Sequence, residues 1–118
     1  PCCEPDHNIT YRPWKGERLL GDACLIPAPI NENVISPEEM GIIFVPALSI
    51  DVFGIRLGYG KGFFDRLRSA TLWQSVPSFV VLPEACVSSD PFPRDTWDVP
   101  FDGWICESGI KSSVKALI

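Results

Sequence analysis

Short apolar runs separated by proline-bearing loops dominate the hydrophobic pattern of this chain. Runs at 42–45, 79–82 and 103–106 predict buried strands, because a strand covered on both faces needs no polar alternation. Weaker alternation at 9–14 predicts an edge strand, and an amphipathic turn at 62–68 predicts a helix. Strand, loop and helix in this order indicate an α/β domain with 42–45 as its central strand. Ligands of such sheets bind beyond the carboxyl ends of the strands.

The segment before the predicted helix holds three glycines on alternate positions, with a lysine between two of them. It reads Arg56-Leu57-Gly58-Tyr59-Gly60-Lys61-Gly62-Phe63-Phe64-Asp65-Arg66. Glycines let backbone N–H groups approach an anion closely, often at positive φ, and the lysine adds a mobile charge. A Walker motif needs a Lys-Ser/Thr pair after its last glycine, whereas Phe63 follows Gly62 here, and the spacing does not fit a dinucleotide motif. The pattern predicts an anion-binding loop, with a plain flexible turn as the alternative.

Three blocks of sequence stand in order along the chain: Val-Pro-Ala-Leu-Ser-Ile-Asp at 45–51, the glycine-rich stretch at 54–66, and Trp-Asp-Val-Pro-Phe-Asp at 97–102 before a strand ending in Glu107. Together they resemble the 5-formyltetrahydrofolate cyclo-ligase (methenyltetrahydrofolate synthetase) family. The resemblance implies one α/β domain over residues 1–118. Its fold would be a three-layer sandwich with a mainly parallel sheet, like that of ribose-5-phosphate isomerase and the CoA-transferases.

The family pattern also contains an N-terminal portion that this sequence does not match. Family members open with a basic helix whose Lys and Arg side chains reach the nucleotide, followed by a strand and helix that wall the folate pocket. Pro1 aligns near the end of the second family strand, so we expect an N-terminally truncated fold, the C-terminal part of the family domain. The family is monomeric, but a bare sheet edge here would invite association.

The resemblance implies an ATP- and Mg²⁺-dependent conversion of 5-formyltetrahydrofolate to 5,10-methenyltetrahydrofolate, in which ATP is consumed and ADP and phosphate are released. Phosphoryl transfer needs mainly positioning and charge neutralisation, and the resemblance assigns these catalytic tasks to Arg56 and Lys61. ATP and phosphate would contact Arg56, Leu57, Gly58, Tyr59, Gly60, Lys61, Gly62, Phe63 and Phe64. The folate substrate would contact Tyr59, Gly60, Lys61, Gly62 and Phe63.

By the same resemblance, Asp65 and Asp98 hold the magnesium ion, which prefers hard oxygen ligands. Each has a structural alternative. Asp65 would stabilise the first turn of its helix, and Asp98 would cap a turn before Pro100. Asp102 is expected to be structural, and Asp51 to bond the loop backbone through an Asx-type turn.

The charge balance narrows the classes of partner. Ten basic against fifteen acidic residues give a net charge of −5, which disfavours nucleic acid and anionic membranes. No apolar run approaches the roughly 18 residues of a membrane span, and no leader opens the sequence, so we expect a cytoplasmic protein. Three other functions stay open: a catalytically impaired nucleotide- or anion-binding remnant, a sugar-phosphate isomerase, and a nucleic-acid-binding relative.

Five cysteines form no recognised motif: Cys2, Cys3, Cys24, Cys86 and Cys106. An odd number at irregular spacing, without Cys-x-x-Cys, argues against a disulfide framework or a zinc site. We interpret them as buried or incidental thiols, with Cys106 in the core. The adjacent Cys2 and Cys3 would oxidise readily if exposed. The single His7 lies in a polar stretch, which disfavours a Cys-His nucleophile.

Overall fold

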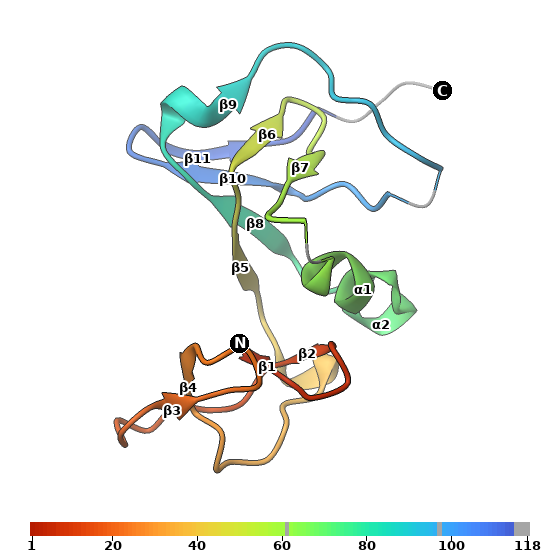
Figure 1. The fold of residues 1–118 in the computed structure, drawn as a ribbon. Coiled ribbons are helices and arrows are strands. Elements are labelled where there is room, and N and C mark those ends of the chain that lie inside the picture. The colour runs from red at the N-terminus through yellow and green to blue at the C-terminus, as the bar shows by residue number, and fades with distance from the viewer. Residues whose placement is uncertain (61, 97, 115–118) are drawn as a thin grey trace.

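A four-stranded sheet with the order β11–β10–β8–β5 lies at the centre of the computed structural model, which describes residues 1–60, 62–96 and 98–114 (Figure 1). Its strands are β5 (Ile43–Pro46), β8 (Ser78–Val81), β10 (Gly103–Cys106) and β11 (Gly109–Ser112). β5, β8 and β10 run parallel, and β11 returns antiparallel beside β10. The expected mixed α/β fold with a mainly parallel sheet is confirmed.

One prediction about the sheet is wrong: the apolar run at 42–45 does not form the central strand. It becomes β5, which in the described part of the chain pairs with β8 alone and therefore lies at an edge. Its residues alternate in burial, since Ile43 is 1% exposed and Phe44 is 51% exposed. An apolar run shows that a strand prefers contact with apolar groups. It does not show whether both faces are covered.

A three-stranded sheet lies beside the main one, and one of its strands leads directly into the segment with the three glycines. In it, β6 (Ser49–Asp51) pairs antiparallel with β7 (Arg56–Leu57) and parallel with β9 (Val87–Ser88). The short helices α1 (Phe63–Ser69) and α2 (Thr71–Gln74) follow. The helix predicted at 62–68 is thus observed one residue later. We call residues 56–62 the glycine loop.

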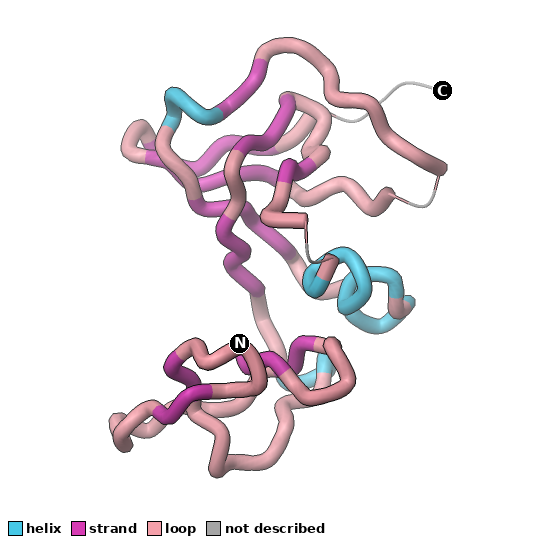
Figure 2. Tube along the Cα trace, in the orientation of Figure 1, coloured by secondary structure: helices cyan, strands magenta, loops and turns pink. Residues whose placement is uncertain are grey.

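Residues 1–42 form a loop-rich N-terminal segment (Figure 2). It contains two small antiparallel ribbons, β1 (Cys2–Cys3) with β2 (Ile9–Thr10), and β3 (Leu20–Gly21) with β4 (Pro27–Ala28). The edge strand expected at 9–14 is therefore reduced to two residues. Two 3₁₀ turns, η1 (Pro37–Glu39) and η2 (Glu84–Cys86), complete the described elements, none of which is a helix able to cross a bilayer.

The core lies on one face of the main sheet. Ile43, Val45, Val80 and Trp104 are buried there, and Phe64, Leu67 and Trp73 from the two helices pack against them. The opposite face is apolar but open. Register places Phe44 beside Phe79, Val81 beside Ile105, and Ile105 beside Ile110, and Ile110 is 69% exposed. Among the described residues, helices cover only one side of the sheet.

This asymmetry predicts the cost of truncating similar side chains. Ile43→Ala leaves a cavity among close-packed residues and is expected to lower the free energy of unfolding by about 2–5 kcal/mol. Ile110→Ala is the matched control and should change it by less than about 0.5 kcal/mol. Urea unfolding followed by circular dichroism measures both. Equal losses from the two variants would contradict the assignment of the core to one face.

Candidate functional site

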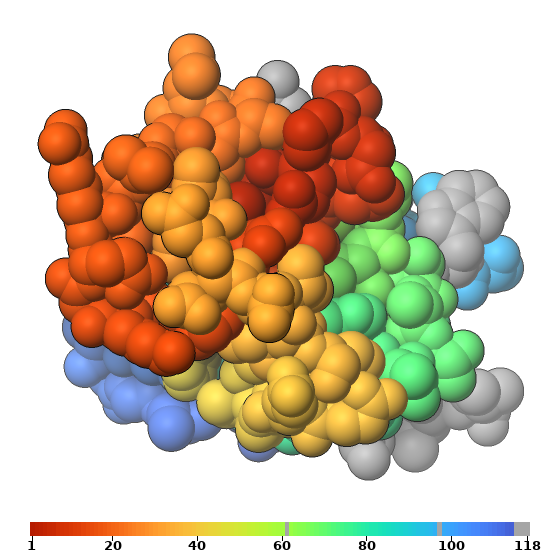
Figure 3. Space-filling model, turned by 90° about the horizontal axis from the view of Figure 1, so that it is seen from below, coloured from red at the N-terminus to blue at the C-terminus, as the bar shows by residue number. Residues whose placement is uncertain are grey.

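A cavity of about 1020 Å³ lies between the N-terminal segment and the glycine loop. From below, the N-terminal residues (red) lie directly against the residues around α1 (green) (Figure 3). Arg66 also donates a hydrogen bond of 2.6 Å to the carbonyl of His7. A smaller hollow of about 270 Å³ near Trp104 and Lys111 contains none of the predicted site residues. The larger cavity therefore contains the candidate site.

Two parts of the chain form the walls of this cavity. Its lining includes Cys3, Glu4, Asp22, Cys24 and Ile26 from the N-terminal segment and Pro46, Arg56, Tyr59, Gly62, Phe63 and Phe64 from the other side. Pro46 ends β5, so the cavity lies beyond the carboxyl end of that strand, as ligand sites of α/β sheets do. Leu57, Gly58, Gly60, Asp65 and Asp98 are described but do not line it. Lys61 lies outside the described residues, as does Trp97.

Arg56 is a fixed cation in the cavity wall. Its Nε donates to the Pro46 carbonyl at 2.8 Å, and its guanidinium lies 5.3 Å from the centre of the Phe64 ring. Burial lowers the pKa of Arg56, while the charges of Asp65 and Tyr59 oppose that shift. An arginine stays charged even so. The cavity therefore contains a permanent, oriented positive charge.

The glycines have separate physical roles. Gly60 and Gly62 have φ of 86° and 71°, a region that side chains with a Cβ rarely adopt. Gly62 is also the N-cap of α1, and its carbonyl accepts a hydrogen bond from Arg66 N at 3.0 Å. A Cβ on Gly58 would collide with the Arg56 guanidinium. The positive φ expected of this loop is confirmed at two of its glycines, and the third makes room for the cation.

The two carboxylates expected to hold magnesium lie in different local settings. Asp65 is exposed in the first turn of α1, and its charge acts on Arg56. Asp98 Oδ2 accepts a hydrogen bond from Asp95 N at 2.7 Å, and Asp98 N donates to the Asp95 carbonyl at 3.1 Å. Asp98 thus caps a turn, as its structural alternative proposed. Their joint binding of Mg²⁺ stays a prediction.

The sequence of this chain is similar to that of one family of known proteins. Residues 14–107 match the model of the 5-formyltetrahydrofolate cyclo-ligase family. The chain belongs to this family. Among curated cyclo-ligases, that of Haemophilus influenzae is 38% identical over 71 residues, covering 58% of this chain and 36% of the relative. That of Mycoplasma genitalium is 30% identical over 76 residues, covering 64% of this chain and 44% of the relative.

Solved cyclo-ligase structures resemble the fold over more of the chain. The 5,10-methenyltetrahydrofolate synthetase of Aquifex aeolicus matches with a TM-score of 0.69 at 27% identity, covering 95% of this chain and 57% of that protein. The synthetase of Mycoplasma pneumoniae matches with a TM-score of 0.53 at 27% identity, covering 69% of this chain and 46% of that protein. The chain spans less than two thirds of each of these relatives.

Two acids of this chain have the structural roles expected of them. Asp51 is buried, and its Oδ1 accepts hydrogen bonds from Phe53 N at 3.0 Å and Ile55 N at 2.9 Å. Asp102 Oδ2 accepts one from Ser78 N at 2.8 Å, which joins the entrances of β10 and β8. Both expectations are confirmed.

Sequence reasoning missed Arg68, which is 3% exposed. Its guanidinium donates to the carbonyls of Val99 at 2.8 Å and Pro100 at 3.0 Å and lies 3.9 Å from the centre of the Phe101 ring. It therefore holds the backbone just after Asp98. Its position four residues after Phe64, on the inward side of α1, was the available signal.

Removing this side chain is expected to loosen the segment. Arg68→Ala leaves two carbonyls without their charged donor and should lower the free energy of unfolding by about 2–4 kcal/mol. Arg18→Ala, at an exposed arginine of the N-terminal segment, is the control and should have an effect near zero. Chemical denaturation measures both. An Arg68→Ala protein as stable as wild type would show that the carbonyls find other donors.

Proposed function

We propose that this chain carries the nucleotide-binding and folate-binding part of a 5-formyltetrahydrofolate cyclo-ligase. The reaction would convert 5-formyltetrahydrofolate to 5,10-methenyltetrahydrofolate with release of ADP and phosphate. The observation that supports it most is the cavity of about 1020 Å³, where Arg56 and the glycine loop face the N-terminal segment. Its volume suits a nucleotide or a folate head group, since ligand pockets typically measure about 300–1,000 Å³.

The proposed chemistry begins at the formyl group, whose oxygen is a poor leaving group. Transfer of the terminal phosphoryl group of ATP to that oxygen would release ADP and let N10 attack the formyl carbon, which closes the ring; phosphate then departs and N10 loses its proton. Arg56, held by the Pro46 carbonyl and the Phe64 ring, would neutralise phosphate charge with little reorganisation. We assign the second positive charge to Lys61. Preorganised cations of this kind stabilise charge that develops in the transition state.

Magnesium, when bound, would neutralise the transferring phosphoryl group. Asp65 and Asp98 fit it as hard oxygen donors: Asp65 is exposed and its charge acts on Arg56, and the Asp98 carboxylate accepts the Asp95 amide through Oδ2. The exposed Tyr59 in the cavity wall would stack on the pterin or adenine ring. We also propose that the protein is cytoplasmic and monomeric, as the family resemblance implies.

A second candidate is a nucleotide- or anion-binding fragment with little turnover. The chain covers only 36–44% of the length of its curated relatives, so any cations that the family places outside this span would be missing from residues 1–118 tested alone. Removing one preorganised donor commonly costs about 10²–10³ in rate. The two candidates share the nucleotide site and differ in turnover.

The test combines turnover with nucleotide binding. Residues 1–118 mixed with 5-formyltetrahydrofolate and Mg-ATP should form methenyltetrahydrofolate, followed by its absorbance, at least about a hundredfold more slowly than a full-length relative. Fusing the N-terminal segment of a relative should restore the rate. Mg-ATP binding without turnover would favour the second candidate. Product formation that does not depend on ATP would overturn the proposed function.

In the same titration, Arg56→Ala should weaken Mg-ATP binding by about tenfold or more, because a charge-assisted contact is roughly twice as strong as a neutral one. Arg18→Ala is the matched control. Unchanged affinity in Arg56→Ala would remove this arginine from the nucleotide site.

The metal assignment has its own test. Asp65→Asn and Asp98→Asn keep an oxygen acceptor at each position but remove its charge, so each should raise the Mg²⁺ concentration required for half-maximal nucleotide binding by about tenfold or more. Asp90→Asn, at an exposed carboxylate, should leave it unchanged. Isothermal titration at several Mg²⁺ concentrations measures the effect. If Asp98→Asn behaves like the control, this residue only caps its turn.

A further inference from the structure

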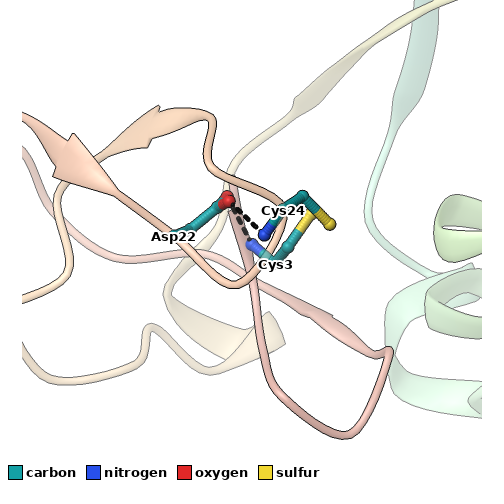
Figure 4. Close-up of side chains that lie close together, drawn as sticks. All are labelled: Cys3, Asp22 and Cys24. Carbon is teal, nitrogen blue, oxygen red and sulfur yellow. Dashed lines mark hydrogen bonds between the residues drawn. The ribbon is translucent and has the colours of Figure 1, made fainter.

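Two thiols that are distant in sequence meet in the wall of the cavity. Cys3 lies in β1, and Cys24 lies in the turn between β3 and β4. Their sulfur atoms and a carboxylate oxygen of Asp22 all lie within 4.8 Å of one another (Figure 4). Both cysteines line the cavity. Their spacing in the sequence gave no sign of this pairing.

The buried carboxylate of Asp22 keeps the two cysteines together. Its Oδ2 accepts a hydrogen bond from Cys3 N at 2.8 Å, and its Oδ1 accepts from Cys24 N at 2.8 Å and from Ile26 N at 3.1 Å. Ala23 N also donates to the Cys3 carbonyl at 3.1 Å. One carboxylate thus fixes both cysteine backbones. Its oxygens are engaged by amides, and two thiols alone fall short of the four ligands of a structural zinc site.

The two thiols differ in access to solvent. Cys24 is exposed, whereas Cys3 is buried. Burial, and then the neighbouring Cys24 thiol, raises the pKa of Cys3 to about 12, so Cys3 is protonated at neutral pH. Cys2 is also buried, so the condition under which the adjacent pair was expected to oxidise readily, exposure to solvent, is not met. Successive residues of a strand face opposite sides, so Cys3 rather than Cys2 faces Cys24.

We propose that Cys3 and Cys24 form a reversible disulfide by exchange with a low-molecular-weight disulfide such as oxidised glutathione. The exposed Cys24 sulfur, as thiolate, attacks one sulfur of the oxidant, and the first glutathione thiolate leaves. The Cys3 sulfur then attacks the Cys24 sulfur of this mixed disulfide, loses its proton to solvent, and releases the second glutathione. In sum, two protein thiols lose two electrons and two protons, and the oxidant becomes two thiols.

The bond would join β1 covalently to the turn after β3, within one wall of the cavity. The wall of the cavity would then be a site of thiol oxidation. Formation of the disulfide would fix the shape of that wall. The reaction requires neither nucleotide nor folate. A negative result for the disulfide would therefore leave the proposed function untouched, and loss of the proposed function would leave the disulfide untouched.

The test exposes the reduced, full chain to oxidised glutathione and follows intact mass without reductant. The expected result is loss of two hydrogen atoms, a linked peptide pair containing Cys3 and Cys24, and full reversal by dithiothreitol. Cys24→Ser should abolish the link, and because Cys24 is exposed, this variant should stay folded. Cys106→Ser is the matched control and should form the link normally. The oxidised wild type should also melt about 5 °C or more higher, because the bond constrains the unfolded chain.

Three results would overturn the proposal. One is accumulation of a stable glutathione adduct on Cys24, and another is a bond that maps to Cys2. The third is one equivalent of Zn²⁺ in the purified protein that Cys24→Ser loses, since this would assign the thiols to a metal. Circular dichroism of the Cys24→Ser variant separates any of these from loss of the fold.

Discussion

The buried carboxylate of Asp51 holds together the part of the molecule on which the cavity depends. Its Oδ1 binds the amides of Phe53 and Ile55 and so closes the turn between β6 and β7, while its Oδ2 accepts from Phe92 N at 2.8 Å. Arg56 directly follows this turn in sequence. The turn therefore fixes the backbone position from which the Arg56 side chain extends toward the cavity. Each amide left unpaired in the interior would cost about 1–3 kcal/mol. The site cation and the proline-rich segment that begins near Phe92 therefore share one anchor.

The same device recurs at two other places in the chain. Asp22, Asp51 and Asp102 each accept backbone amides from segments that are distant in sequence. Twelve prolines remove donors from the ladders that would otherwise order the backbone. Because buried amides still need partners, aspartates replace strand neighbours in these loops. Three of the fifteen acidic residues of this acidic chain are thus part of its internal framework.

Sequence alone predicts what depends on local geometry. The glycine loop and its helix follow from the need for positive φ at Gly60 and Gly62, and the strand around Val80 follows from its apolar run. What depends on distant partners was not predicted. The edge position of β5 needs its neighbours, and the burial of Arg68 depends on carbonyls 31 and 32 positions away. The convergence of Cys3 with its partner thiol likewise depends on hydrogen bonds that no spacing rule contains.

The two walls of the cavity come from opposite parts of the chain, residues 1–26 and residues 46–64. A ligand that touches both walls would act as a non-covalent tether between them. Anything that binds the closed arrangement better than the open one shifts the population toward it by mass action. Occupancy would then slow amide hydrogen exchange in β1 and β2 along with that of the glycine loop, although these strands are only two residues long. Local order in the N-terminal segment is thus thermodynamically linked to what the cavity holds.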